Sequence, residues 1–136
     1  GEPNQAKYTA NMERGIDTSG ILTMDYSGFK AVSIAAKDCA APARYIIQGT
    51  KGYILQKSTA NCCGGVTFHP NEGKEEHYNL NGDRPRQAAE FEAFYRAMTA
   101  GDQELCARML DTSIAVSRVL TVARRSAGVR FPGDRF

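Results

Sequence analysis

IIQGTKGYILQ, residues 46–56, places two glycines around a threonine and a lysine, between two apolar runs. A phosphate-binding P-loop needs the pattern GxxxxGK[ST] between a strand and a helix, so that backbone N–H groups and the helix N-terminus hold the phosphate. Here the lysine precedes the second glycine, and a strand-like run follows. The stretch therefore predicts a β-hairpin whose glycines form the turn at positive φ, with Lys51 making no nucleotide contact.

Strand-like patterns extend on both sides of this hairpin, because apolar and polar residues alternate with a period of two. The expected strands cover residues 5–12, 21–26, 29–36, 44–48, 52–56, 66–69 and 76–80. Residues 14–20 are expected to form a turn-rich connector, and Ser27-Gly28 a tight reversal. Pro70 opens a further hairpin turn over residues 70–73. The first 80 residues are thus predicted to be mostly strand.

After Pro85 the period of the pattern changes to that of a helix. Four apolar residues fall at i, i+3, i+4 and i+7 and form one stripe: Phe91, Phe94, Tyr95 and Met98. Pro85 is tolerated in a first helical turn because the N–H group that it lacks has no partner there. Asp102 is a candidate N-cap for a second helix, and Gly128 fits its C-terminal cap. The arginines of this second helix are interpreted as a solvated face.

Strands first and helices last predict the α+β class in one domain over residues 1–136. We expect a largely antiparallel open β-sheet of about six or seven strands, with the two C-terminal helices packed on one face. The other face is expected to carry a mixture of polar and apolar residues, namely Thr23, Ser33, Gln48 and Gln56 with Ile21, Ile46 and Ile54. A face of that kind commonly contacts another subunit or domain.

Composition excludes several classes of protein. The net charge of +2 comes from 17 basic and 15 acidic residues, a balance that gives no indication of nucleic-acid binding. No apolar run approaches the length of a membrane span, so we expect no membrane partner. The 4 cysteines are few for 136 residues, and two of them are adjacent, which argues against a disulfide framework. Reduced thiols in a cytoplasmic protein are expected.

The cysteines and histidines do not follow the spacing of known metal sites. Cys62 and Cys63 are adjacent rather than separated by two residues, and His69 and His77 are isolated, so no metal site is predicted and the thiols are interpreted as ordinary. A zinc protein stays as an alternative that stoichiometric metal would support. No GxGxxG, GxSxG or HExxH pattern occurs. The residues therefore predict no cofactor-binding fingerprint.

Three carboxylates remain as candidates for acid–base chemistry. Asp17 lies in the turn-forming run IDTSG, where aspartate commonly caps backbone N–H groups. Asp25 ends an expected strand. Glu90 lies on the first expected helix and is interpreted as a solvated or capping side chain. From the residues alone, no catalytic residue is predicted.

Several short patterns, taken in order, resemble one known family. They are GEP at residues 1–3, RGIDTSG at 14–20, IIQGTKGYI at 46–54, ExxxFxxxM at 90–98 and ARRSAGV at 123–129. Together they resemble the C-terminal half of the glucose–fructose oxidoreductase / inositol dehydrogenase / MocA-type (Gfo/Idh/MocA) family of NAD(P)-dependent dehydrogenases. The resemblance covers nearly the whole chain and rests on the order and spacing of the patterns.

The resemblance implies a two-part enzyme. In the family, an N-terminal Rossmann domain binds the nicotinamide cofactor and supplies a lysine from a Glu-Lys-Pro motif, and an Asp-x-x-x-His helix supplies the acid–base histidine. Neither motif occurs in this chain. The chain is therefore expected to be a domain of a longer enzyme, downstream of its catalytic residues, and inactive alone. Hydride transfer on a sugar, polyol or related hydroxyl substrate is implied for the full-length enzyme.

The resemblance also implies cofactors and partners. NAD or NADP would bind the full-length enzyme and neither would bind this chain. The implied partners are the enzyme's own Rossmann domain and further copies of the chain, in a homo-oligomer formed through the open sheet face. The alternative is a stand-alone, non-catalytic α+β binding or dimerisation module.

One residue is carried over as a substrate-side candidate. Many relatives place an aromatic residue near the sugar, three positions before the glutamate that matches Glu90. Gln87 occupies that position here, which is a departure from the family pattern. Residues 78–87 and 64–69 are the candidate rims of a pocket.

Overall fold

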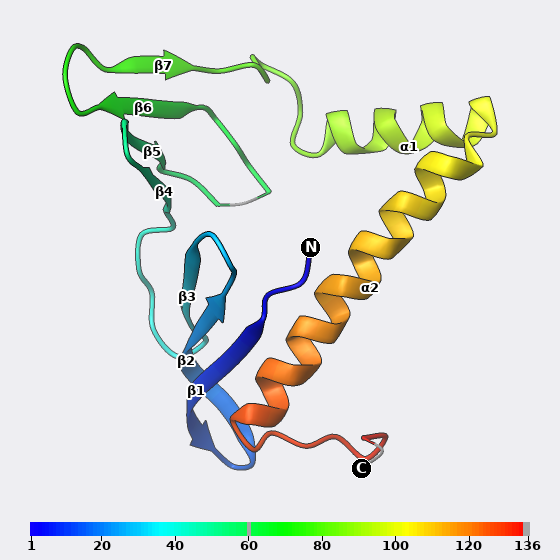
Figure 1. Ribbon diagram of the computed structural model, residues 1–136. Coiled ribbons are helices and arrows are strands. Elements are labelled where there is room, and N and C mark those ends of the chain that lie inside the picture. Colours follow the sequence, from blue (N-terminus) through cyan, green and yellow to red (C-terminus); the bar gives the residue numbers. More distant parts are fainter. Residues whose placement is uncertain (60, 135–136) are drawn as a thin grey trace. The chain divides into compact units, whose positions relative to one another are not determined.

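The computed structural model describes residues 1–59 and 61–134 (Figure 1). Seven strands precede two helices in the described residues, and every strand pair is antiparallel. The elements are β1 (Gln5–Glu13), β2 (Ile16–Asp25), β3 (Lys30–Ala36), β4 (Tyr45–Gly49), β5 (Gly52–Gln56), β6 (Val66–Pro70), β7 (Glu76–Tyr78), α1 (Ala88–Ala100) and α2 (Gln103–Ser126). The predicted α+β class, with antiparallel strands followed by two helices, is confirmed.

The seven strands form two open sheets, with orders β1-β2-β3 and β4-β5-β6-β7. The chain correspondingly has two compact units. The first unit combines Gly1–Ala40 with the segment that begins at Gln103, and therefore contains β1–β3 and α2. The second unit, Ala41–Asp102, contains β4–β7 and α1.

The connector predicted over residues 14–20 is much shorter than expected. Arg14 and Gly15 have φ values of 52° and 81°, and β2 already begins at Ile16. Two consecutive residues at positive φ form a tight hairpin turn whose twist matches that of the strands. A shift of register between Asn11 and Met12 accommodates the turn. The turn-like composition of IDTSG misled the prediction, because these residues pair with β1 instead.

Helix α2 packs against β1 and covers one face of the first sheet. Ala6, Ala123 and Val129 are buried in this unit. The backbone N–H of Tyr8 donates a hydrogen bond to Ser126 Oγ at 2.8 Å, which joins the two elements directly. The small side chains of both alanines allow helix and strand to approach closely, so the core of the first unit lies at the C-terminal half of α2.

In the second unit, residues 46–56 form the predicted hairpin. Gly49 pairs with Gly52 across a turn of two residues, and β5 follows directly. Gly52 has φ of 144°, and a Cβ atom there would lie 2.2 Å from the carbonyl oxygen of His69 on β6. Glycine is thus required by both backbone conformation and the neighbouring strand. The β-hairpin prediction is confirmed, but the turn residues are Thr50 and Lys51, and of the two glycines Gly52 has a positive φ and Gly49 does not.

Helix α1 begins at Ala88, three residues later than the sequence predicted, because Gln87 adopts a left-handed conformation with φ of 65°. Pro85 lies in the turn before the helix, and its carbonyl accepts a hydrogen bond from the Ala88 N–H. Gly101, at φ of 63°, ends the helix in an αL cap. The predicted apolar stripe on this helix is exposed: Phe91, Phe94, Tyr95 and Met98.

The mixed sheet face that was predicted does not exist as one surface. Ser33 lies opposite Leu22, whereas Thr23 is the next residue along β2, so Thr23 and Ser33 point to opposite faces. Likewise, Gln48 pairs with Tyr53 on β5, and Gln56 lies three residues after Tyr53. The side chains of Gln48 and Gln56 are therefore on opposite faces of the second sheet. An odd separation along a strand always reverses the face, and register could not be assigned before the turns were known.

Candidate functional site

Each unit has a hollow lined by its own residues. In the first unit, a cavity of about 560 Å³ lies between the sheet and α2, and we call it the helix-side pocket. It is lined by Tyr8, Asp17, Gly20, Leu22, Ser33, Ala35, Ser117, Leu120, Thr121, Ala123, Arg124, Val129 and Phe131. A mainly apolar lining with several hydroxyl groups is typical of small-molecule sites.

The polar side of the helix-side pocket is a chain of hydrogen bonds centred on Asp17. The Tyr8 hydroxyl donates to Asp17 Oδ2 at 3.0 Å, and Lys37 Nζ donates to Asp17 Oδ1 at 2.9 Å. The hydrogen bond from Lys37, followed by the one from Tyr8, lowers the pKa of Asp17. Burial, followed by the hydrogen bond to Asp17, raises the pKa of Tyr8. Tyr8 therefore keeps its proton. The hydrogen bonds among Tyr8, Asp17 and Lys37 position the Tyr8 ring rather than activating an acid.

Gly20 explains how the Tyr8 ring fits across the sheet. A Cβ atom at Gly20 would lie 2.3 Å from a ring carbon of Tyr8 and 2.6 Å from its hydroxyl oxygen. Strand β2 pairs Gly20 with Ala10, so the ring of Tyr8 lies diagonally over the position without a side chain. Close approach, not backbone conformation, requires glycine here.

Arg124, which lines the helix-side pocket, forms an ion pair that sequence reasoning missed. Arg124 on α2 contacts both carboxylate oxygens of Asp134 at 2.6 Å, and its guanidinium lies 4.1 Å from the centre of the Phe131 ring. The Arg124 guanidinium, followed by the Phe131 N–H, holds the pKa of Asp134 well below its usual range. Hydrogen bonding to Asp134 raises the pKa of Arg124.

The interpretation of the helix arginines as a solvated face is therefore wrong for Arg124, whose side chain is only 18% exposed. Its carboxylate partner lies ten residues later, after the Gly128 cap has reversed the chain. The cap was predicted and is confirmed, since Gly128 has φ of 79° and Val129 N–H donates to the Arg124 carbonyl. The order of Arg124, Gly128 and Asp134 in the sequence was the pattern that could have indicated this ion pair. Whether Arg124 and Asp134 meet depends on the geometry of the turn between them.

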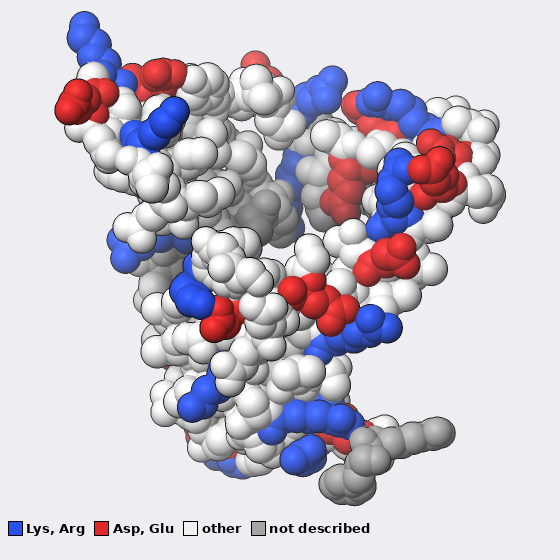
Figure 2. Space-filling view, in the orientation of Figure 1, with Lys and Arg blue, Asp and Glu red and all other residues white. Residues whose placement is uncertain are grey.

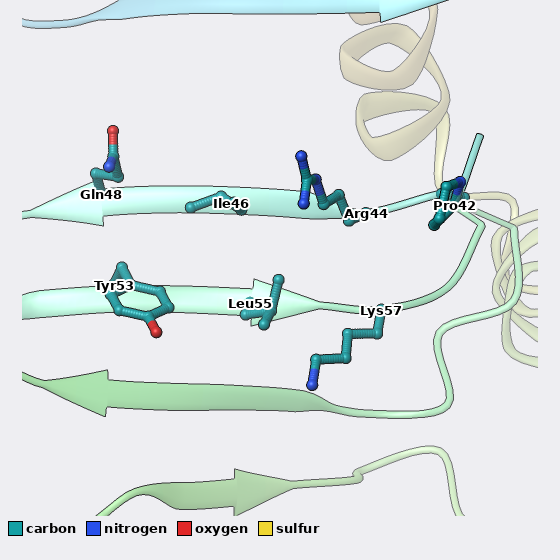
Figure 3. Close-up of a pocket in the computed structure, with 8 residues that line it drawn as sticks. Pro42, Arg44, Ile46, Gln48, Tyr53, Leu55 and Lys57 are labelled. Carbon is teal, nitrogen blue, oxygen red and sulfur yellow. The ribbon is translucent and has the colours of Figure 1, made fainter.

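In the second unit, a cavity of about 470 Å³ opens on one face of the β4–β5 hairpin, and we call it the hairpin-face pocket. Its lining is Pro42, Ala43, Arg44, Ile46, Gln48, Tyr53, Leu55 and Lys57. Figure 3 shows the side chains of the two neighbouring strands along this face. Ile46 pairs with Leu55 and Gln48 with Tyr53, and cross-strand partners share a face. The register of β4 and β5 thus places these side chains together on one face, where they line the pocket.

Both histidines lie beside this pocket on the same sheet face, because β6 pairs Tyr53 with His69 and β7 pairs Thr67 with His77. The Tyr53 and His69 rings are stacked with centroids 4.4 Å apart. His69 Nδ1 lies 2.8 Å from Glu75 Oε1, and its Nε2 is buried without a hydrogen-bond partner in the described part of the chain. His77 Nδ1 lies 2.9 Å from Thr67 Oγ1.

Metal ligands do not gather anywhere in residues 1–59 and 61–134. No group of three or more His, Cys, Asp or Glu side chains in this part of the chain is placed to hold an ion. Cys62 and Cys63 are exposed and free, as are Cys39 and Cys106.

The sequence candidates fall in different places. Gln87 directly precedes α1, where its carbonyl accepts the Phe91 N–H at 3.1 Å, and its side chain makes no capping hydrogen bond. It lines neither the helix-side nor the hairpin-face pocket. Asp25 is paired with Lys30, and Glu90 is exposed in the first turn of α1. Of these four residues, Asp17 alone lines one of the two pockets.

On the face shown in Figure 2, basic and acidic side chains are interspersed. Within the described ranges, neither helix is long and apolar enough to cross a membrane.

The chain is similar to two known proteins. No family model matches the chain. It is 24% identical over 136 residues to scyllo-inositol 2-dehydrogenase (NADP(+)) IolU of Bacillus subtilis (strain 168), covering 99% of the chain and 41% of IolU. The resemblance to the Gfo/Idh/MocA-type family is confirmed. An uncharacterized oxidoreductase of Escherichia coli (strain K12), YgjR, is 27% identical over 135 residues, covering 98% of the chain and 40% of YgjR. The chain thus spans about two fifths of the length of these two relatives.

Proposed function

We propose that the chain is the C-terminal substrate-side and oligomerisation domain of an NAD(P)-dependent oxidoreductase, which acts by hydride transfer on a sugar, polyol or related hydroxyl substrate. The observation that carries this proposal is the alignment of nearly the whole chain with two fifths of a dehydrogenase and of an oxidoreductase. The rest of such an enzyme would hold NAD or NADP. The name of IolU, which specifies NADP(+), supports the cofactor class.

Residue chemistry is consistent with a domain that leaves catalysis to another part of the enzyme. The chain contains no GxGxxG fingerprint for a dinucleotide. Asp17 and Tyr8 are occupied with each other and with Lys37. Gln87, in a left-handed backbone conformation just before α1, is proposed to face the substrate side. The free cysteines suit a reducing compartment, and we place the enzyme in the cytoplasm.

The outer face of β1–β3 is the surface we propose for self-association. Ile21 pairs with Ile34, and Val32 lies two residues before Ile34 on the same face. These three side chains are 45%, 76% and 62% exposed. α2 covers the opposite face of the same sheet. Contiguous exposed aliphatic side chains on a sheet commonly mark a protein–protein interface.

Sedimentation velocity tests the self-association. The protein should show concentration-dependent association, and Ile34→Lys should shift it toward monomer because a charge would be buried in the interface. Leu80→Lys is the matched control, since Leu80 is an aliphatic side chain 98% exposed outside the sheets. Strictly monomeric protein at high concentration, or equal effects of both changes, would reject this surface.

Titration with NADH tests the other half of the proposal. The chain should show no saturable NADH binding and no turnover of sugars or polyols. Tight, saturable binding at one site per chain would count against the assignment to the part of the enzyme that does not hold the nucleotide.

A stand-alone α+β binding or dimerisation module is the second candidate. It is favoured by two pockets, each lined by the residues of a single unit. The coding sequence upstream separates the two candidates. A reading frame that continues upstream into a strand, a GxGxxG turn and a helix supports the oxidoreductase, and a start codon directly before Gly1 supports the module.

A further inference from the structure

We propose that the hairpin-face pocket binds a small organic anion, that is, a carboxylate or phosphate group on a carbon skeleton. The inference rests on the charge and shape of this pocket and is independent of the proposed oxidoreductase function. It concerns residues of the second unit alone.

The charge of the pocket is positive and uncompensated. Arg44 and Lys57 line the cavity, and no acidic residue does. Neither cation forms an ion pair with any residue in the described ranges 1–59 and 61–134. By contrast, Arg124 of the helix-side pocket is neutralised by Asp134. An oxyanion would supply the hairpin-face pocket with the partner that its own residues lack.

Glu75, the acidic partner of His69, is already engaged. Glu75 Oε1 lies 2.8 Å from His69 Nδ1, and His69 in turn stacks on Tyr53. This arrangement leaves the two cations of the pocket available and also fixes the plane of the Tyr53 ring.

The rest of the lining indicates that the anion is organic. Ile46 and Leu55 form an apolar pair on the floor between the two strands. The Tyr53 ring, 40% exposed, offers a flat surface for C–H groups, and the Gln48 side chain opposite offers a hydrogen-bonding amide. A bare inorganic ion would use only the charges. A carbon skeleton with hydroxyl groups would use every part of the lining.

Calorimetric titration in low salt tests the proposal with four probes: gluconate, glucose 6-phosphate, inorganic phosphate and myo-inositol. We expect at least one of the two organic anions to bind more tightly than inorganic phosphate, and neutral myo-inositol not to bind. The tighter of gluconate and glucose 6-phosphate tells a carboxylate site from a phosphate site. Added salt should weaken binding, because the cations are exposed.

Two variants and one control assign the binding to the pocket. Arg44→Gln and Lys57→Gln should each weaken the binding of the preferred anion about 3- to 10-fold, the range for a partly solvated charged hydrogen bond. Lys51→Gln removes the same charge at the other end of the same hairpin and should change nothing. Circular dichroism verifies that each variant is folded.

Three results would overturn the proposal. They are no binding of either organic anion, binding of myo-inositol as tight as that of the anions, and an equal loss in Lys51→Gln. Inorganic phosphate binding as tightly as both organic anions would mean an adventitious ion only. None of these results bears on sedimentation or NADH binding, so failure here is distinct from failure of the proposed function.

Discussion

The two units use similar amphipathic helices in different ways. In the first unit, α2 lies on β1, and Ala6 of β1 and Ala123 of α2 are buried. In the second unit, α1 buries only Ala97, while its aromatic stripe is exposed. The 3.6-residue period therefore predicts a helix, but it does not tell whether the partner of its apolar face lies in the same unit.

The two units also differ in the interactions that stabilise them. The first unit has side-chain links between distant segments, such as Tyr8 N–H to Ser126 and Arg124 to Asp134. The second unit depends on backbone geometry at its hairpins, where Gly52 approaches β6 closely. We therefore expect the largest single effects in the second unit from glycine, and in the first from polar and steric contacts.

The largest effect is expected for Gly52→Ala. The new Cβ would lie 2.2 Å from the His69 carbonyl oxygen and 2.8 Å from Pro70 Cα, at a φ of 144° that side chains rarely adopt. Backbone must move, so the free energy of unfolding should fall by more than about 2 kcal/mol. Urea unfolding followed by circular dichroism measures it.

Gly49→Ala is the matched control on the paired position of the same hairpin. Its Cβ would meet only the Gly52 carbonyl oxygen, at 3.6 Å, which is ordinary contact. A much smaller loss is expected. Equal losses for the two changes would show that the close approach to β6 does not control the second sheet.

Gly20→Ala should have the next largest effect, in the first unit. The new Cβ would push the Tyr8 ring away from Asp17, and overpacking of this kind costs about 1–3 kcal/mol. In a Tyr8→Ala background the same change should cost much less, because the clashing ring is gone. Denaturant unfolding of the four proteins of this double-mutant cycle measures the coupling. Additive losses would contradict the contact.

Asp134→Asn should lower the melting temperature at neutral pH, because Arg124 loses its ionised partner. The folded pKa of Asp134 is lowered from 3.8, so its contribution is complete above that value and is lost as pH falls through the folded pKa. The difference between wild type and variant should therefore shrink below about pH 4. Thermal melts at several pH values check this.

The control for this series is Asp111→Asn. Asp111 is exposed on α2 and forms no ion pair with the described residues. It should leave the melting temperature nearly unchanged at neutral pH. A pH-independent effect of Asp134→Asn would show that shape, rather than charge, matters at Asp134.

The smallest effect is expected for Lys51→Ala. Lys51 is exposed in the turn of the β4–β5 hairpin, and the backbone rather than its side chain accepts the Asn71 N–H. The free energy of unfolding should change by no more than about 0.5 kcal/mol, and self-association should not change. A large loss in either unfolding or sedimentation measurements would show that the turn is misinterpreted.

Local patterns predicted much of the fold, because turns and caps are determined by neighbouring residues. In the hairpin over residues 46–56 and in the helix cap, Gly52 and Gly128 use the positive φ that glycine adopts readily. The start of β2 at Ile16 was missed, since a turn-like composition can also occur in a paired strand.

The pockets were harder to predict because they depend on register and on contacts between distant residues. Tyr8, Gly20 and Arg124 meet only once β1, β2 and α2 are in place, and no local pattern marks such a meeting. Arg44 and Lys57 share a cavity because the strands between them pair in one register. A shift by one residue would separate them onto opposite faces.

The contrast between the two helices is tested most directly by hydrogen exchange of backbone amides, measured by mass spectrometry at a concentration where the protein is monomeric. Amides in the C-terminal half of α2 should exchange more slowly than those of α1, because only the former lie under a packed sheet. Equal protection in the two helices, or slower exchange in α1, would contradict the account.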